Sequence, residues 1–502
     1  MAVNPNPLPI SVKTRKTTTT YSISLSVTSA DINDNGSFTP KLTPSPRHAS
    51  TSREEIDQYD QFDYVNSSST RLQPTPKEIY ILGLGSVGKL IAHSLRGIAN
   101  PPPITLLAHR KALYDEWQVS KKVITLEQDG YNLDASGFEM ELALPSTRAF
   151  GVEIDDPDMI YNNEQGLLPH EAAAKIKRQQ ARRPAPEAPA QPDENAEPEP
   201  GVSNEVIHSL IVTVKAPRTV SALLAVKHRL RPESTICFLQ NGMGILDHVN
   251  EHVFPDPETR PNYILGIVTH GANSPRGSSP FFAIHAGHGT IALGIQPRRR
   301  ASQAGTGTAT ATATEPGKPT ALYLMRTLTR TPVLQAVGLP PTEFLQQQLE
   351  KLAQNAVINP LTVLMDARNG SLLYNYAITR TMRLLLGEIS LVARSLPELR
   401  GLPNVNTRFS PERLETMVVG LANATRTNVS SMLADVRHGV SSEIAFINGY
   451  VVRRGEEVGV QCVCNYMVVQ MVGAKNMMIQ RELQDRVPTE RVDESTGERR
   501  EG

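Results

Sequence analysis

One lysine and two asparagines recur at four-residue intervals in the segment 351–370, KLAQNAVINPLTVLMDARNG. On a helix of about 3.6 residues per turn, Lys351, Asn355 and Asn359 lie along one face, so one ammonium and two carboxamides point in the same direction. Such a row can bind a small polar substrate. The same spacing also occurs on an ordinary solvated helix, so the rest of the chain must distinguish the two interpretations.

The other positions of this segment indicate how the row is presented. Leu352, Ala356, Val357 and Ile358 are apolar and predict a face that packs into a core. Pro360 lacks a backbone N–H, and we expect it to end or kink the helix at this turn. The pattern is typical of a helix that is seated in a core and presents polar groups into a cleft.

Composition excludes several classes of function for the 502-residue chain. Lys+Arg and Asp+Glu both number 51, so no overall charge favours nucleic acid or an anionic membrane as the partner. Cys237, Cys462 and Cys464 cannot build a disulfide framework and are not spaced as a metal site, which favours a reducing compartment. No apolar run approaches the roughly 18 residues that span a bilayer. These properties predict a soluble protein without a bound metal.

Residues 1–76 are rich in Ser, Thr, Pro and Asn and show no sustained hydrophobic period, which predicts a disordered arm. Its first 30 residues contain Lys13, Arg15 and Lys16, many Ser and Thr, and no acidic residue, a composition that organellar transit peptides share. Two locations follow from this. The protein is cytoplasmic if the arm is plain disorder, and mitochondrial if the arm is a transit peptide.

The first ordered segment combines a short apolar run with a glycine-rich turn, EIYILGLGSVGKLIAHSLRGI. Residues 79–82 predict a strand, and apolar residues at helical spacing follow the turn. Strand, turn and helix together form the context that the GxGxxG fingerprint of dinucleotide-binding proteins requires. The free amides at the helix N-terminus would face the phosphate oxygens. The predicted pyrophosphate-binding residues are Gly83, Gly85, Ser86, Val87 and Gly88.

The next strand, ITLLAHR, ends in positive charge. An NAD-binding site carries Asp or Glu at this strand end, where this chain has His109, Arg110 and Lys111. A guanidinium suits the 2′-phosphate of NADP, because it forms bidentate charge-assisted hydrogen bonds. Arg110 therefore predicts NADP(H) as the cofactor, and a solvated charge after a strand is the other interpretation of this residue.

Further strands deliver polar residues to the same sheet edge. Residues 210–214 predict a strand that ends at Lys215, and TICFLQNGMG predicts one that ends near Asn241. In open parallel sheets, ligands bind at the carboxyl edge. YILGIVTHGANSPRG and FFAIHAGHGTIALGI alternate in the manner of the last strands of this sheet. Low-complexity sequence at about 146–204 and 296–319 predicts two flexible inserts, and from about Thr320 the chain is predicted to be helical throughout.

Six segments, in order, closely resemble the ketopantoate reductase family, the 2-dehydropantoate 2-reductases: GLGSVG, VTVKA, QNGMG, KLAQNAVINPLTVLMDARNG, NVSSMLADVRHG and SSEIAFINGYVVRR. The resemblance covers roughly 77–145, 205–295 and 340–475. It implies an α/β Rossmann-type dinucleotide-binding domain at 77–335, followed by an all-α substrate domain of the 6-phosphogluconate dehydrogenase-like kind at 336–486. The arm, the inserts and a polar tail at 487–502 lie outside the resemblance.

The family reduces ketopantoate to pantoate with NADPH, a step toward pantothenate and coenzyme A. The resemblance implies that Lys351 is the catalytic lysine, either the acid that protonates the carbonyl oxygen or the cation that stabilises the developing alkoxide. Glu443 matches a carboxylate at the junction of cofactor and substrate, where it would orient Lys351 or a substrate hydroxyl. Its other interpretation is an acid in the first turn of a helix.

The resemblance also implies the binding residues. Substrate contacts are expected from Asn355, Asn359, Asn369, Asn241 and Ser431, with Ser430 as the alternative register for the serine. Cofactor contacts are expected from the glycine turn, Arg110, Lys215 and Asn241. The implied partner is a small 2-oxo acid, and the protein is a monomer or a homodimer. Two other functions stay open: a reductase of another 2-oxo acid, and a non-catalytic homologue that uses its arm and inserts to bind partners.

Overall fold

The computed structural model describes residues 77–144, 201–275, 277–297 and 319–485, together with the backbone of the short strands β6 (Arg148–Ala149) and β7 (Val152–Glu153). The predictions made for the N-terminal arm, for most of the two inserts and for the C-terminal tail lie outside these residues. Within them, no helix is long and apolar enough to cross a membrane.

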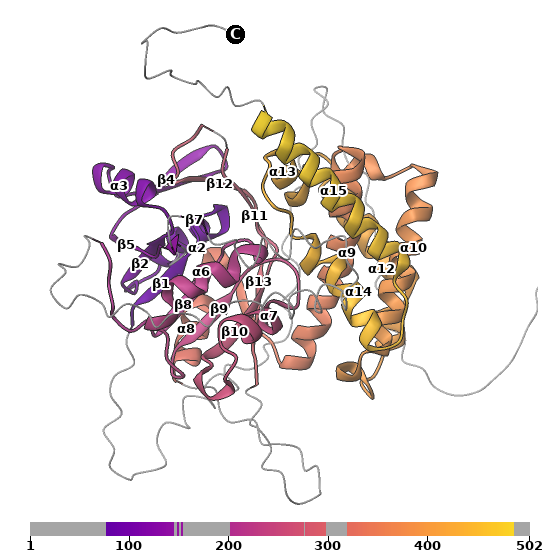
Figure 1. Ribbon diagram of the computed structural model, residues 1–502, viewed down its shortest axis with the longest axis horizontal. Helices are drawn as coiled ribbons and strands as arrows, with labels where there is room; N and C mark the ends of the chain where they lie inside the picture. The colour runs from indigo at the N-terminus through magenta and orange to yellow at the C-terminus, as the bar shows by residue number, and fades with distance from the viewer. Residues whose placement is uncertain are drawn as a thin grey trace, which may run out of the picture. The chain divides into compact units, whose positions relative to one another are not determined.

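An eight-stranded sheet forms the centre of the N-terminal domain (Figure 1), in the order β14-β13-β10-β9-β8-β1-β2-β5. The strands are β1 (Ile79–Leu82), β2 (Ile104–Ala108), β5 (Phe138–Leu142), β8 (Ser209–Val212), β9 (Thr235–Phe238), β10 (Asn262–Val268), β13 (Ile291–Ile295) and β14 (Ala336–Gly338). From β5 to β10 all neighbours are parallel, and β13 is antiparallel to β10. This is the Rossmann strand order. Strands are added on one side of β1 as far as β5 and then, from β8 onward, on its other side. The switch lies between β1 and β8 and places a ligand crevice there.

Helices cover both faces of this sheet. On β1, Ile79 and Ile81 face one core and Tyr80 and Leu82 face the other, as the two-residue period of a strand requires. Both faces are buried, so the central strands read as continuous apolar runs. The first core contains residues of α2 (Ser86–Arg96), α3 (Lys111–Val119) and α8 (Pro319–Thr329), and the second contains residues of α6 (Thr219–Val226) and α7 (Ile245–His252).

Two strands predicted for the main sheet lie in a different one. β11 (Gly271–Asn273) and β12 (Phe282–Gly287) join β3 (Ile124–Gln128) and β4 (Tyr131–Ala135) in a separate four-stranded sheet. The expectation that 263–295 simply continues the main sheet is therefore wrong for this part. The physical reason is that β10 is already paired on both sides, by β9 and β13, so it offers no free edge.

Two smaller expectations also differ from the structure. The strand predicted at 210–214 is β8, which spans Ser209–Val212. The chain beyond Thr320 is not helical throughout, because β14 pairs in parallel with β13 and belongs to the main sheet. The boundary predicted between residues 335 and 336 therefore falls at the start of a strand of the N-terminal sheet.

The C-terminal region is helical and is built around α9 (Pro341–Met365), against which several of the other helices pack (Figure 1). Its apolar face is buried as predicted: Leu352, Ala356, Val357 and Ile358 are all in the core. The remaining α-helices are α10 (Tyr376–Ser395), α11 (Val405–Arg408), α12 (Pro411–Ala424), α13 (Ser431–Arg437), α14 (Asn448–Glu457) and α15 (Val463–Asp485).

Pro360 does not end α9, which continues to Met365. A proline in a helix leaves the carbonyl four residues earlier without its usual N–H donor, and here that carbonyl belongs to Ala356. The Nδ2 of Asn448 donates to this oxygen at 2.8 Å and also to Oδ1 of Asn465 at 3.0 Å, and Asn448 is completely buried. A side-chain amide from α14 thus replaces the missing backbone donor and lets the helix pass through the proline.

We expect Asn448→Ala to lower the free energy of unfolding by about 1–3 kcal/mol, because the Ala356 carbonyl would remain buried without a donor. Urea unfolding measures the effect, with Asn423→Ala as the control, since Asn423 is an exposed residue of α12. In a Pro360→Ala background the residue at 360 regains its N–H, so the cost of Asn448→Ala should shrink. An equal cost in both backgrounds would contradict this explanation.

Candidate active site

The glycine turn between β1 and α2 has the backbone geometry that its sequence predicts. Gly83 has φ +106°, and a Cβ there would lie 2.7 Å from the backbone nitrogen of Val214. A Cβ at Gly88 would lie 2.0 Å from the Gly83 oxygen, so helix and turn pack closer than any other residue allows. At Gly85 a Cβ would meet open space, and α2 begins with no acidic residue and no side-chain cap. Free amides beside open space fit a bound pyrophosphate.

Cations lie on both sides of this turn. Arg110 follows β2 and is exposed at the start of α3, and Arg218 is exposed at the end of the short helix η2 (Ala216–Arg218), which follows β8. Burial lowers the pKa of His109, and the charges of Arg110 and Arg218 lower it further, so both guanidinium groups act on the same position. Among the described residues, neither guanidinium has an ion-pair partner. The sequence analysis did not single out Arg218, although it lies three residues after Lys215, beyond the same strand.

Lys351 meets Asn241 where the two domains face each other. Its Nζ donates to Oδ1 of Asn241 at 3.1 Å and also to the carbonyl of Val268, at the end of β10. Burial lowers the pKa of Lys351 to about 8, and the charge of Glu443 acts in the opposite direction. An ammonium whose pKa lies close to neutral pH is suited to giving up a proton during a reaction.

Glu443, from the helical domain, binds two groups of the Rossmann domain. Its Oε1 accepts from the backbone N–H of Ala216 at 3.1 Å, and its Oε2 accepts from Nδ2 of Asn241 at 3.4 Å. The residue is 4% exposed and its carboxylate reaches across to the other domain. Glu443 stands at the start of the short helix η8 (Ile444–Phe446), but its side chain does not cap that helix. With Nδ2 bound by Glu443, the Oδ1 of Asn241 is turned toward Lys351. Glu443 and Lys351 are therefore both hydrogen-bonded to Asn241.

The predicted asparagine row lies along α9 beside Lys351. A small cleft is lined on one side by residues of α9, including Lys351 and Asn355, and on the other by the loop after β9 and by β10. Gln348, one turn before Lys351, also lines it and was missed by the sequence analysis. Gly242, in the loop, has φ +89°, and a Cβ there would lie 2.7 Å from Phe446. Asn359 lies two turns beyond Lys351 and is 7% exposed.

Asn369 lies just beyond the end of α9. It is buried in the short helix η6 (Asn369–Leu372), where its Nδ2 donates to Oγ1 of Thr425 at 2.9 Å and its backbone N–H donates to Asn428. The amide thus ties the end of α9 to the loop after α12. Its donor is engaged within the helical domain, whereas its buried Oδ1 has no hydrogen-bond partner among the described residues, so the expected substrate contact stays a prediction.

Ser430 and Ser431, the two alternatives for the substrate-binding serine, differ in their surroundings. Ser430 caps α13, accepting from the N–H of Leu433 at 3.2 Å, and its hydroxyl lies 2.6 Å from that of Thr362 on α9. Ser431 is the first residue of α13 and is exposed. The buried hydroxyl of Ser430 is therefore used in packing, and Ser431 is the serine that remains accessible to a ligand.

Lys215, expected to contact the cofactor, binds an acid that sequence reasoning missed. Its Nζ lies 2.8 Å from Oδ2 of Asp435 on α13 and 4.0 Å from Oε2 of Glu443. Asp435 follows Ser431 by four residues, so both belong to the same helix face. That spacing was the available signal for Asp435.

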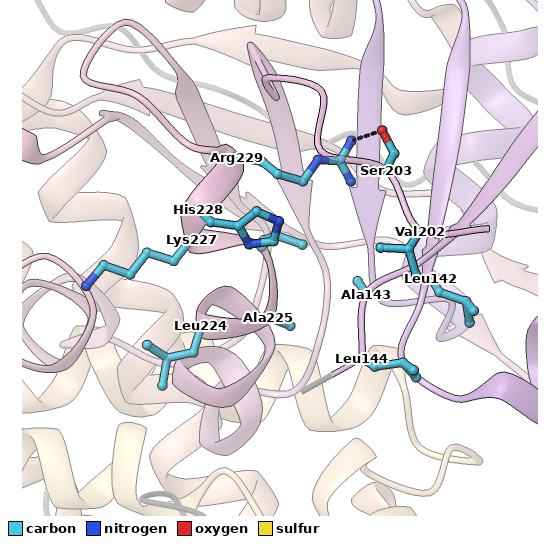
Figure 2. A pocket seen from close by; sticks show the side chains of 11 residues that line it. Leu142, Ala143, Leu144, Val202, Ser203, Leu224, Ala225, Lys227, His228 and Arg229 are labelled. Carbon is cyan, nitrogen blue, oxygen red and sulfur yellow. Dashed lines mark hydrogen bonds between the residues drawn. The ribbon is translucent and has the colours of Figure 1, made fainter. Parts of the chain in front are cut away.

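A larger cavity of about 690 Å³ lies elsewhere on the Rossmann domain (Figure 2) and is lined by none of the predicted site residues. Its most polar wall is Arg229, whose side chain is 1% exposed and donates to Oε2 of Glu141 at 2.8 Å and to the carbonyl of Glu205 at 2.7 Å. The guanidinium is therefore engaged in holding the chain together. The candidate site remains the cleft beside Lys351.

Two family models match the chain. Ketopantoate reductase PanE/ApbA matches residues 166–298, and Ketopantoate reductase PanE/ApbA C terminal matches residues 343–476, together more than half of the sequence. The chain belongs to the ketopantoate reductase family. The first match begins inside the segment interpreted above as an insert, so part of 146–204 is family sequence. Membership makes the protein an oxidoreductase.

Relatives of this ketopantoate reductase family member include 2-dehydropantoate 2-reductases and ketoisovalerate reductases. Probable 2-dehydropantoate 2-reductase of Schizosaccharomyces pombe is 28% identical over 52% of this chain and 71% of its own length. The 2-dehydropantoate 2-reductase of Vibrio cholerae is 28% identical over 53% of this chain and 78% of its own. The ketoisovalerate reductase of Beauveria bassiana is 23% identical, over 84% of this chain and 88% of its own.

Solved structures show the same fold. A PanE/ApbA family ketopantoate reductase from Ralstonia eutropha superposes with a TM-score of 0.51 at 18% identity, covering 80% of this chain and 99% of that one. A D-mandelate dehydrogenase in a ternary structure with NADH and anilino(oxo)acetate gives 0.50 at 14% identity, with the same coverage. The predicted fold class, a Rossmann-type domain followed by a helical domain, is confirmed.

Proposed function

We propose that this ketopantoate reductase family member is an NADPH-dependent reductase that converts 2-dehydropantoate to pantoate. The observation that carries the proposal is the ammonium of Lys351, which is held by two acceptors, Asn241 and the Val268 carbonyl. An ammonium has three N–H groups, and the third has no partner among the described residues. It is available to the carbonyl oxygen of a substrate in the cleft.

NADPH, when bound, supplies the hydride that adds to the 2-oxo carbon. The proton for the carbonyl oxygen then comes from Nζ of Lys351, which is left as a neutral amine. Because negative charge develops on that oxygen only as hydride arrives, a fixed cation beside it stabilises the transition state more than the ground state. Asn355 and Asn359 can donate to the substrate carboxylate and accept from its terminal hydroxyl, which orients the carbonyl without adding charge.

The choice of NADPH is supported by the charges around the glycine turn. Arg110 stands where an acidic residue would bind the ribose hydroxyls of NAD, and Arg218 adds a second guanidinium on the opposite side. Both are exposed and without ion-pair partners among the described residues. Two cations without a neighbouring carboxylate favour a cofactor with an additional phosphate.

A second substrate, 2-oxoisovalerate, is favoured by one observation. The similarity to the ketoisovalerate reductase of Beauveria bassiana extends over 463 residues, whereas that to the dehydropantoate reductase of Schizosaccharomyces pombe extends over 262. The two oxo acids share the carboxylate and carbonyl that Lys351 and the asparagines would bind. They differ in the terminal hydroxymethyl group of 2-dehydropantoate.

Steady-state kinetics with 2-dehydropantoate, 2-oxoisovalerate and oxaloacetate, each with NADPH and NADH, test the proposal. We expect the highest kcat/KM with 2-dehydropantoate and NADPH. A higher value with 2-oxoisovalerate would transfer the proposal to that substrate. Failure to bind NADPH, and to oxidise it with any of the three acids, would favour the non-catalytic homologue.

A further inference from the structure

An ion pair joins the two domains at the edge of the candidate site. Lys215 follows β8 of the Rossmann domain, and Asp435 lies on α13 of the helical domain, with 2.8 Å between Nζ and Oδ2. The side chain of Asp435 is 14% exposed and that of Lys215 is 38% exposed. The Asp435 carboxylate is therefore largely shielded from water, which makes its contact with the partly exposed Lys215 stronger than an ion pair on an open surface.

The position of Asp435 is fixed from its own side. α13 packs against α9, and the hydroxyls of Ser430 and Thr362 lie 2.6 Å apart at the start of that contact. Asp435 therefore moves with the helix that carries Lys351. An ion pair formed by Asp435 with the Rossmann domain holds that helix against the cofactor-binding side.

Lys215 is followed directly by Ala216, whose N–H donates to Glu443. Glu443 in turn accepts from Asn241, and Asn241 accepts from Lys351. Three links thus lead from the ion pair to the proposed proton donor. The other carboxylate near Lys215 is Glu443 itself, at 4.0 Å.

We propose that Asp435 is a positioning residue that holds Lys215 in its closer ion pair and so limits the approach of Lys215 to Glu443, which remains bound to Asn241 and keeps Lys351 oriented. Without the Asp435 carboxylate, Lys215 moves from 4.0 Å into direct contact with Glu443, draws its carboxylate away from the Ala216 N–H and competes with the Asn241 amide for Oε2. The inference rests on the proposed reductase function, because the consequence it describes is a loss of the proton donor's orientation.

Protonation of the Asp435 carboxylate should have the same effect as its replacement by a neutral side chain. The charged groups that face Asp435 are Lys215 and Glu443, and burial is the main cause that raises the pKa of Asp435, to about 6. As the pH falls through about 6, Asp435 becomes neutral and releases Lys215. The kcat of the wild-type enzyme should therefore fall below this pH. The pH profile of Asp435→Asn, which has no carboxylate to protonate, should lack this fall on the acid side.

The test compares Asp435→Asn with Asp366→Asn, a matched control because Asp366 pairs with Arg437 of the same helix at 2.8 Å and is exposed. We expect Asp435→Asn to lower kcat about 10-fold to 100-fold, as misorientation of a catalytic group does, with little change in KM for NADPH and without the acid limb near pH 6. Asp435→Glu, which restores the charge, should recover part of kcat. Wild-type kcat and an unchanged acid limb in Asp435→Asn would overturn the inference.

Amide hydrogen exchange of a peptide that contains Ala216 provides a readout that needs no turnover. Exchange at Ala216 should be faster in Asp435→Asn than in wild type and in Asp366→Asn, because its acceptor Glu443 is drawn toward Lys215. If wild type reduces none of the oxo acids, the proposed function fails, and this measurement still tests the ion pair. Equal exchange in all three proteins would overturn the inference.

Discussion

Lys351→Ala is expected to lower kcat by about 1000-fold, within the range for loss of a positioned general acid. The variant loses the proton for the carbonyl oxygen and the cation beside the developing alkoxide. NADPH affinity should change little, because the residues placed around the pyrophosphate and the 2′-phosphate belong to the segments that follow β1, β2 and β8. Stopped-flow turnover and a fluorescence titration with NADPH measure the two quantities.

The pH profile gives this prediction a second readout. Burial lowers the pKa of Lys351 to about 8, and the acid must be protonated to act, so kcat should fall as the pH rises through about 8. The residual rate of Lys351→Ala should lack this basic limb. Lys121→Ala, which removes an exposed lysine of the Rossmann domain, serves as the control. Turnover within 10-fold of wild type would exclude Lys351 as the proton donor.

Arg110→Asp is expected to reduce the preference for NADPH over NADH, expressed as the ratio of kcat/KM values, by on the order of 100-fold. The substitution removes a charge-assisted partner of the 2′-phosphate and places a carboxylate where it repels that phosphate and can accept from the ribose hydroxyls of NADH. Kinetics with both cofactors at saturating oxo acid measure the ratio.

Arg218→Ala should change the same ratio in the same direction but less, because it removes one cation and adds no repulsion. Arg400→Asp, an equal charge change at an exposed position of the helical domain, should leave the ratio unaltered. If Arg110→Asp also leaves it unaltered, another group reads the phosphate.

Features that depend on neighbouring residues were predictable. The strand, turn and helix at 79–96 follow from an apolar run, glycines at fixed spacing and helical periodicity, and the structure reproduces them nearly residue by residue. The buried face of α9 follows in the same way. Each of these signals lies within one or two turns of chain, where periodicity and backbone preference decide the structure.

Features that depend on residues far apart in the sequence could not be predicted from it. Pro360 predicted a possible helix end, and only the amide of Asn448, 88 residues later, allows α9 to continue. β11 and β12 alternate like strands of the main sheet, but pairing is decided by which edges are free. The hydrogen bonds of Asn369 with Thr425 and Asn428 likewise form only in the folded helical domain.

The sequence by itself determined the fold class, the glycine turn, the cation after the second strand and the polar face of Lys351 to Asn359. Tertiary structure decided what that face does. It brought Asn241 to Lys351 and joined Glu443 to Ala216 across 227 residues of chain, and it placed Asp435 against Lys215 across 220. Such contacts join residues that no periodicity relates, because they form only when a Rossmann domain and a helical domain pack together and bury their charged groups against each other.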